Sequence, residues 1–494
     1  MSTPPKNQQW STLDKDLGRI SQIEYATTYV SRPLVAPGIA LAFIVVAGLA
    51  AAVLFGQSPV NLIVVAAAVF GAYMALNIGA NDVANNMGPA VGANALTMGG
   101  AIVIAALFES AGALLAGGDV VSTISKGIID PASIAEAEVF IWAMMAALIS
   151  SALWVNLATW VGAPVSTTHS VVGGVMGAGI AAAGFAAVNW PTMGKIAASW
   201  VISPLLGGII AAAFLAFIKA KIIYQEDKIA AARRWVPVLV GIMAGAFASY
   251  LALKGLKRIV KIDIQTSLLI GLVIGAITYA VSSPFIRRQS EGMENRNKSL
   301  KTLFGLPLVF SAALLSFAHG ANDVANAVGP LAAIVHAAEA HAIEAKVSIP
   351  MWVMVIGAFG ISFGLFLFGP KLIRMVGSQI TKLNPMRAYC VALSAAITVI
   401  VASWLGLPVS STHIAVGAVF GVGFFREWHA ERRLRNSAAK RPTTKRIAPE
   451  ERRRRKLVRR SHFMTIVAAW VITVPAAALM SGVIFLILNG LIAA

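Results

Sequence analysis

Long apolar runs set the pattern of this chain, and the polar residues gather between them. Runs long enough, or nearly long enough, to cross a bilayer as helices lie at residues 34–56, 60–78, 96–117, 137–162, 197–218, 236–254, 266–285, 306–318, 350–369, 387–406 and 464–490. Several of these runs are short or rich in Gly and Pro. The pattern predicts an all-α polytopic membrane protein with about 10–12 transmembrane spans.

Four further apolar stretches contain Ser, Thr, Gly or Pro and do not read as full spans. They lie at residues 119–134, 164–187, 371–385 and 408–425. Irregular backbone at membrane depth is tolerated only where protein buries it or water reaches it. These stretches are therefore predicted to be re-entrant or hairpin elements.

One polar heptapeptide interrupts the apolar pattern twice. Gly-Ala-Asn-Asp-Val-Ala-Asn occurs at residues 79–85 and again at 320–326, and a Gly-Pro pair follows each copy, at 88–89 and 329–330. This composition predicts a break in each helix, with a half-helix that begins at the break and points unpaired N–H groups into it. A carboxylate at such a depth indicates a functional site.

A second repeated motif shows that the chain is duplicated. Trp-Val-Gly-Ala-Pro-Val-Ser-Thr-Thr-His at residues 160–169 matches Trp-Leu-Gly-Leu-Pro-Val-Ser-Ser-Thr-His at 404–413. The two copies are 244 residues apart, close to the 241 residues that separate the heptapeptides. The sequence therefore predicts two homologous transport repeats, 60–218 and 306–490, joined by a linker with two spans at 219–305.

Charge predicts the orientation of the two repeats. The linkers 219–234, 287–301 and 426–460 are each net basic, so all three are expected in the cytoplasm. The last span of the first repeat ends at such a linker, whereas the last span of the second repeat begins at one. The repeats are therefore predicted to be inverted in the membrane, with Met1 inside and Ala494 outside.

Composition narrows the classes of function. The chain is 58% hydrophobic and 12% charged, against about 25% charged residues in a soluble domain. The net charge of +19 does not indicate nucleic-acid binding, because the segment 426–460 holds fifteen Lys or Arg and four acidic residues. That segment is either a solvated linker or a site for anionic lipid or a regulator. Residues 1–33 are polar and precede an additional span at 34–56. Cys390 is the one cysteine, which excludes an internal disulfide.

The two motifs together offer both anion donors and carboxylates. Asp82 and Asp323 would repel an anion unless a cation or proton neutralised them, which is the physical requirement for symport, and such oxygen ligands suit Na⁺, Mg²⁺ or Ca²⁺. Side-chain amides and hydroxyls can donate hydrogen bonds to an oxyanion. The candidate substrate-binding residues are Asn81, Asp82, Asn85, Ser166, Thr167, Thr168, Asn322, Asp323, Asn326, Ser410, Ser411 and Thr412.

Other polar residues at membrane depth have two interpretations each. Glu109 costs about 2.5–3.5 kcal/mol inside its apolar run, so we interpret it as a coupling-ion or proton site, with a small uncharged residue near Gly360 as its nearest equivalent. His169 and His413 either relay protons or bond to backbone for packing. Lys126 either approaches the anion or extends to the interface, and the latter is favoured.

The remaining alternatives concern structural roles. His319 has no counterpart in the first repeat, where Ile78 stands, and packing is the favoured interpretation of it. The Asn and Asp residues could simply cap the next half-helix, and Ser and Thr commonly bond back to their own helix. The duplication in register argues against both of these explanations.

These motifs resemble those of the Pit/PiT family of inorganic phosphate transporters. The resemblance rests on Gly-Ala-Asn-Asp-Val-Ala-Asn and Pro-Val-Ser-(Thr/Ser)-Thr-His in both repeats and covers about residues 60–490. It implies phosphate import, an inverted-repeat transport domain in the bacterial inner membrane, and a phosphate site built from the four motifs. Phe108 and Glu109 match a Phe-Glu pair that the family uses in transport. Sodium-coupled animal members carry a second carboxylate where this chain has Ala392, so the resemblance is closer to proton-coupled bacterial members.

The sequence thus predicts a symporter that imports inorganic phosphate as a divalent metal-phosphate complex coupled to protons, by alternating access. Asp82 and Asp323 would bind the metal, and Asp82, Asp323, Glu109, His169 and His413 would bind the coupling ion. No permanently bound cofactor is expected; the co-transported species are H⁺ or Na⁺ with Mg²⁺ or another divalent metal.

The alternatives are a sodium-coupled phosphate symporter, a divalent cation transporter and, in a different class, a membrane enzyme that uses Ser and His of the second motif. The expected partners are phosphate and the lipid bilayer, without nucleic acid, and a homo-oligomer is compatible with the sequence.

Overall fold

The structure is a computed structural model, and it describes residues 34–54, 60–130, 133–134, 136–161, 165–255, 262–340, 349–379, 383–440 and 460–493. Within these ranges, eleven helices are long and apolar enough to cross a membrane, which confirms the predicted fold class. The N-terminal segment 1–33 and most of the basic loop, 441–459, lie outside the described residues.

The first repeat begins after a separate helix, Leu34–Leu54, that packs against it. Its helices are α2 (Val60–Asn81), α3 (Val83–Gly92), α4 (Met98–Ala116), α5 (Gly118–Lys126), α6 (Ala137–Val161), α7 (Thr167–Ala183) and α8 (Trp190–Ile218), with a 3₁₀ turn, η2 (Phe185–Ala187), before α8. Side-chain oxygens set several starts, because Thr97, Ser166 and Asn189 cap α4, α7 and α8.

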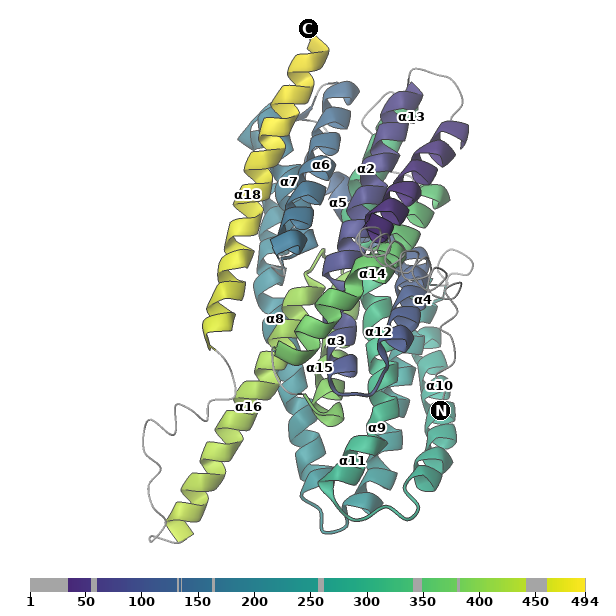
Figure 1. The fold of residues 1–494 in the computed structure, drawn as a ribbon, viewed down its shortest axis with the longest axis vertical. Helices are drawn as coiled ribbons and strands as arrows, with labels where there is room; N and C mark the ends of the chain where they lie inside the picture. The colour runs from purple at the N-terminus through teal and green to yellow at the C-terminus, as the bar shows by residue number, and fades with distance from the viewer. Residues whose placement is uncertain are drawn as a thin grey trace, which may run out of the picture.

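The linker forms a helical hairpin, and the second repeat follows it. The linker elements are η3 (Lys219–Ile223), α9 (Lys228–Tyr250), η4 (Leu251–Gly255), α10 (Ile264–Gln289) and the short α11 (Asn297–Leu303), and the second-repeat helices are α12 (Gly305–Asp323), α13 (Ala325–Ala340), α14 (Met351–Gln379), α15 (Pro385–Trp404), α16 (Ser411–Lys440) and α18 (Arg460–Ala493). Figure 1 shows α3 below α2 but α13 above α12, so the two repeats run in opposite directions.

The helix interruptions at the heptapeptides are milder than predicted. Only Asp82 separates α2 from α3, and only Val324 separates α12 from α13. Asp82 keeps helical dihedral angles (φ −86°, ψ −33°), and its N–H still bonds to Ile78 O at 3.0 Å. A helix therefore ends and a new one begins within each heptapeptide, as predicted, although the backbone at Asp82 stays in the helical region.

The close helix crossings reveal a twofold relation between the repeats. A Cβ at Gly79 would lie 1.9 Å from the carbonyl oxygen of Ile361, where α2 crosses α14, and a Cβ at Gly320 would lie 2.1 Å from that of Glu109, where α12 crosses α4. Only glycine permits such an approach of two backbones. Glu109 and Ile361 are therefore equivalent, which corrects the expectation of a small residue near Gly360.

The predicted hairpin elements have mixed outcomes. In the region 119–134 a short helix, α5, follows α4, and in the region 164–187 α7 has 17 residues. The prediction of a separate re-entrant or hairpin element at 371–385 was wrong, because α14 continues to Gln379 as one helix. In the region 408–425, α16 does begin after an irregular stretch, but it runs on to Lys440.

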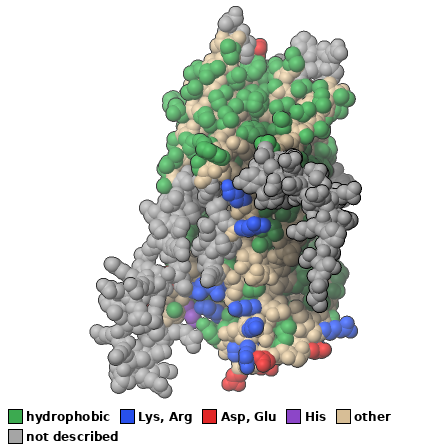
Figure 2. All heavy atoms as spheres, in the orientation of Figure 1, with side chains coloured by type: hydrophobic (Ala, Val, Ile, Leu, Met, Phe, Trp, Pro, Cys, Tyr) green, Lys and Arg blue, Asp and Glu red, His purple; other side chains and the backbone are tan. Residues whose placement is uncertain are grey.

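The described parts of the three basic linkers lie at one end of the molecule. The turns around η3 and α11 and the end of α16 gather at the bottom of Figure 1, and the C-terminus lies at the top. Figure 2 shows Lys and Arg side chains concentrated over this lower end and hydrophobic side chains over the upper part. The two ends thus differ in charge as the sequence predicted.

Candidate functional site

The hydroxyl motifs place two helix N-termini in the core. Ser166 is the N-cap of α7, and its Oγ accepts from the N–H of His169 at 3.1 Å; Ser410 does the same for His413 at 3.2 Å at the start of α16. The disfavoured alternative, in which Ser bonds back to its own helix, therefore applies to these two residues. The free N–H groups of a first helical turn favour negative charge, so α7 and α16 supply positive helix ends in addition to those of α3 and α13.

Asp82 accepts hydrogen bonds from both hydroxyl motifs. Thr167 Oγ1 donates to its Oδ2 at 2.6 Å, and Thr412 Oγ1 donates to its Oδ1 at 2.9 Å. Thr167 belongs to the same repeat as Asp82 and Thr412 to the other. One carboxylate therefore ties the first turns of two helices from opposite repeats.

Asp323, the equivalent of Asp82, has a different environment. Ser411 Oγ donates to its Oδ2 at 3.1 Å, and Nε2 of His319 lies 2.9 Å from the same oxygen. On its other side, Nδ1 of His319 lies 2.5 Å from Oε2 of Glu109, whose Oε1 accepts from Asn86 at 2.9 Å. His319 thus bridges two carboxylates, and the equivalent positions in the other half are Ile78 and Ile361.

The asparagines bind the hydroxyl motif of the opposite repeat. Asn85 Nδ2 donates to Thr412 Oγ1 at 2.9 Å, and Asn326 Nδ2 donates to Thr167 and Thr168 Oγ1, each at 3.1 Å. These contacts are related by the internal twofold relation. They lock the two repeats together around the carboxylates.

A second pair of asparagines fixes the helices that precede the hydroxyl motifs. Asn81 Nδ2 donates to Thr159 Oγ1 of α6 at 2.9 Å, and Asn322 Nδ2 donates to Ser403 Oγ of α15 at 3.0 Å. Asn322 Oδ1 also accepts from the N–H of Val409 at 3.2 Å, whereas the buried Asn81 Oδ1 has no hydrogen-bond partner within the described part of the chain. The two asparagines therefore occupy equivalent positions in the two repeats, but the hydrogen bonds of their side-chain oxygens differ.

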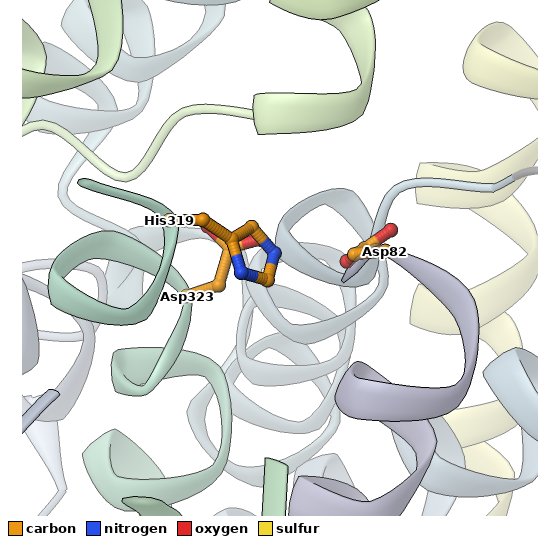
Figure 3. A group of neighbouring side chains, drawn as sticks. All are labelled: Asp82, His319 and Asp323. Carbon is orange, nitrogen blue, oxygen red and sulfur yellow. The ribbon is translucent and has the colours of Figure 1, made fainter. Parts of the chain in front are cut away.

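The candidate substrate-binding residues, Glu109 and the two histidines of the hydroxyl motifs are all at most 4% exposed. Asp82, His319 and Asp323 each offer a ligand atom, and these atoms lie within 4.8 Å of one another. In Figure 3, His319 and Asp323 from α12 face Asp82 from the other repeat. With Glu109 these residues form a cluster of three carboxylates and one histidine, which needs a cation or protons to become neutral.

The other candidates lie around this centre. His169 and His413 pack edge to face with their ring centroids 4.5 Å apart, and Trp200 covers His169 at 3.9 Å. Lys126 is half-buried in the last turn of α5. Cys390 is fully buried, as expected of a packing residue.

Two residues that the sequence did not select, His319 and Asn86, complete the site. His319 immediately precedes the second heptapeptide, but the apolar counterpart of this residue in the first repeat argued for packing. Asn86 directly follows the first heptapeptide and has Ala327 as its equivalent. The sequence contained a signal for each of the two residues, because both are polar residues at membrane depth.

Comparison with known proteins identifies related chains. Residues 78–481 match the model of the phosphate transporter family. A protein of Helicobacter pylori (strain 26695), provisionally named a phosphate permease, is 50% identical over 430 residues, which is 86% of this chain and 80% of the relative. A Pyrococcus abyssi protein with the same provisional name is 36% identical over 85% of this chain and 96% of its own length. A solved structure described as "The sodium-dependent phosphate transporter" superposes with a TM-score of 0.78 at 34% identity and covers 87% of this chain and 99% of that one.

Proposed function

The chain belongs to the phosphate transporter family, and from that premise we propose that it is a secondary active symporter that imports inorganic phosphate together with a neutralising cation. The observation that carries this proposal is the set of hydrogen bonds on the two aspartates. Each Ser or Thr hydroxyl has one proton to donate. Thr167 and Thr412 give theirs to Asp82, and Ser411 is within donating distance of Asp323.

Competition for these donors explains coupling. A phosphate ion in the centre needs the same hydroxyl protons, so it competes directly with the aspartates for them. A proton or metal ion on the aspartates removes their negative charge and frees the donors for phosphate. The site is then stable when it is empty and when it binds phosphate together with the cation. Phosphate alone is repelled by Asp82 and Asp323. Obligatory co-transport follows from this competition.

We propose protons as the coupling ion. His319 links Glu109 to Asp323 within a buried core, and a histidine between two carboxylates can take a proton from one and pass it to the other. Asn86 donates a hydrogen bond to the other carboxylate oxygen of Glu109 and so fixes the orientation of the Glu109 side chain. We assign Glu109 and His319 to the proton route. The buried pair of histidines, His169 and His413, is assigned to the same route.

A divalent metal is proposed to travel with phosphate. Asp82, His319 and Asp323 supply two carboxylates and an imidazole, which suit Mg²⁺ or a similar ion through the oxygens and a softer metal through the nitrogen. The metal in this account is cargo, so phosphate would enter the site as a complex with reduced charge.

Sodium coupling is the second candidate, because the similar solved structure is that of a transporter described as sodium-dependent. In this chain the sodium ion would take the place of the proton at Asp82 and Asp323. An esterase built on Ser166 and His169 is not favoured, since the hydroxyl of Ser166 caps α7 and the motif is duplicated in inverted repeats.

Alternating access is proposed to occur by movement of the repeats about the shared site. The asparagine–threonine contacts between Asn85 and Thr412 and between Asn326 and Thr168 would exchange in this movement. The basic end would face the cytoplasm of the cell, in the inner membrane of a bacterium, with Met1 inside and Ala494 outside.

Calorimetric binding of phosphate to the purified protein tests the donor competition. Titrations in buffers of different ionisation enthalpy should show that phosphate binding takes up protons. Asp82→Asn should bind phosphate with this proton uptake reduced, because one repelling charge has been removed. Phosphate binding without any proton, sodium or metal dependence in the unmodified protein would contradict the proposal.

A further inference from the structure

A polar stripe leads away from the site along one face of α2. Tyr73, Asn77 and Asn81 follow one another at four-residue spacing, which places them on the same side of the helix, and Asn85 of α3 continues the spacing beyond Asp82. Tyr73 is nine residues from Asp82, about 14 Å along the helix axis. The stripe starts at the site and runs toward the end of α2 that lies opposite the basic linkers (Figure 1).

Helix α6 completes this stripe with two further polar side chains. Asn156 Nδ2 donates to Asn77 Oδ1 at 3.2 Å, and Asn77 Nδ2 donates to the backbone oxygen of Tyr73 at 2.9 Å. Thr159 accepts from Asn81 closer to the site. Asn77 is buried, Tyr73 and Thr159 are half-buried, and Asn156 is exposed. The polar file therefore leads from the buried centre to the outer surface of the helix bundle.

The other repeat lacks this file, although its backbone is equivalent. Asn81 and Asn322 match, as do Thr159 and Ser403, so the frame near the site is shared. Beyond this frame, the equivalents of the outer polar residues are apolar: Leu314 stands for Tyr73, Ala318 for Asn77 and Ile400 for Asn156. Leu314 and Ala318 are buried. Helix packing alone would be served by apolar residues in both repeats.

The side-chain amide oxygen of Asn81 adds an independent observation. This residue is 3% exposed, and its Oδ1 has no hydrogen-bond partner among the described residues. Its equivalent in Asn322 accepts from Val409 N–H. A buried amide oxygen is costly unless it is paired, so Asn81 offers an acceptor at the inner end of the file for a water molecule, a cation or a protonated phosphate.

We propose that Tyr73, Asn77, Asn81, Asn156 and Thr159 form a hydrated approach route by which phosphate reaches Asp82 from the side of the membrane opposite the basic linkers. The route rests on the proposed phosphate transport for the identity of its solute. Its neutral amides and hydroxyls replace water around an ion without binding it tightly, which suits passage rather than storage. The apolar equivalents keep the opposite side dry in this arrangement of the repeats.

Cysteine accessibility tests the route without relying on transport. In a Cys390→Ala background, Tyr73→Cys, Asn77→Cys and Asn156→Cys are compared with the equivalent variants Leu314→Cys, Ala318→Cys and Ile400→Cys. A membrane-impermeant anionic thiosulfonate is applied to sealed vesicles from the side on which a C-terminal protease site can be cut. The thiolate is the reactive form and is stable only where water reaches, so the first three should react about tenfold faster or more than their equivalents.

Phosphate should slow the reaction at Asn77→Cys. Equal rates within each pair, or reaction of Asn77→Cys only from the basic-linker side, would overturn the proposal. Thiol reactivity in the predicted pattern without any phosphate protection or uptake would leave the hydrated route intact and refute phosphate as its solute.

Any variant that fails to insert is replaced by Asn77→Leu with Asn156→Leu, judged against Ile400→Leu. The double substitution should reduce uptake severalfold, with protein levels and elution profile unchanged. Uptake equal to that of Ile400→Leu would overturn the proposal.

Discussion

Replacing Gly320 by alanine should separate the two helices that hold the Glu109–His319 pair. A Cβ at Gly320 would lie 2.1 Å from the carbonyl oxygen of Glu109, while ordinary contact begins at 3.4 Å. The helices α4 and α12 must therefore move apart by about 1.3 Å, because the obstacle is backbone and has no rotamer to change. His319 is one residue from Gly320, so its contact with Glu109 is stretched by the same movement.

We expect Gly320→Ala to destabilise the protein by about 1–3 kcal/mol and to lower phosphate uptake by about 100-fold, since a displacement near 1 Å misplaces reacting groups. Thermal unfolding followed by size-exclusion chromatography and uptake into vesicles measure the two effects. Gly99→Ala in the same helix pair is the matched control, because nothing lies within 4 Å of its Cβ. Equal melting temperature and uptake in the two variants would refute the crossing and the role of the pair.

Four further substitutions test the site. Asp82→Asn and Asp323→Asn should each abolish gradient-driven uptake while the protein still inserts, and full uptake in either variant would remove that carboxylate from the mechanism. Thr412→Val removes a hydrogen bond to a charged group worth about 1.5–3 kcal/mol, so phosphate uptake should fall about 10–100-fold. The control Thr398→Val loses only a hydrogen bond to Ser394 O of its own helix, so its uptake should stay near the unmodified level. Glu109→Gln should lose proton-driven uptake but retain phosphate exchange between equal solutions, and unchanged stimulation by a pH gradient would contradict its place in the proton route.

The sequence predicted the fold and most of the site because both are duplicated. Two motifs at nearly one offset revealed the repeats, and polar residues at membrane depth pointed to the same centre that the structure assembles. Asn85 and Asn326 illustrate this agreement, since each one contacts the hydroxyl motif of the other repeat. Repetition identified these residues without knowledge of their contacts.

The asymmetric features could not be predicted in the same way. His319 contacts Glu109 from a different repeat, 210 residues away, and its counterpart Ile78 made a functional role look unsupported. The geometry of the break at Asp82 could not be predicted either, because composition locates the interruption but not the helical dihedral angles that this residue keeps.

Uptake of radiolabelled phosphate into proteoliposomes tests the central claim most directly. An inward proton gradient or an inward sodium gradient is imposed, each with and without Mg²⁺. The account predicts that the proton gradient drives uptake and that Mg²⁺ raises it. Uptake that requires sodium would transfer the coupling role to that ion, and the absence of phosphate uptake under every gradient would contradict the account.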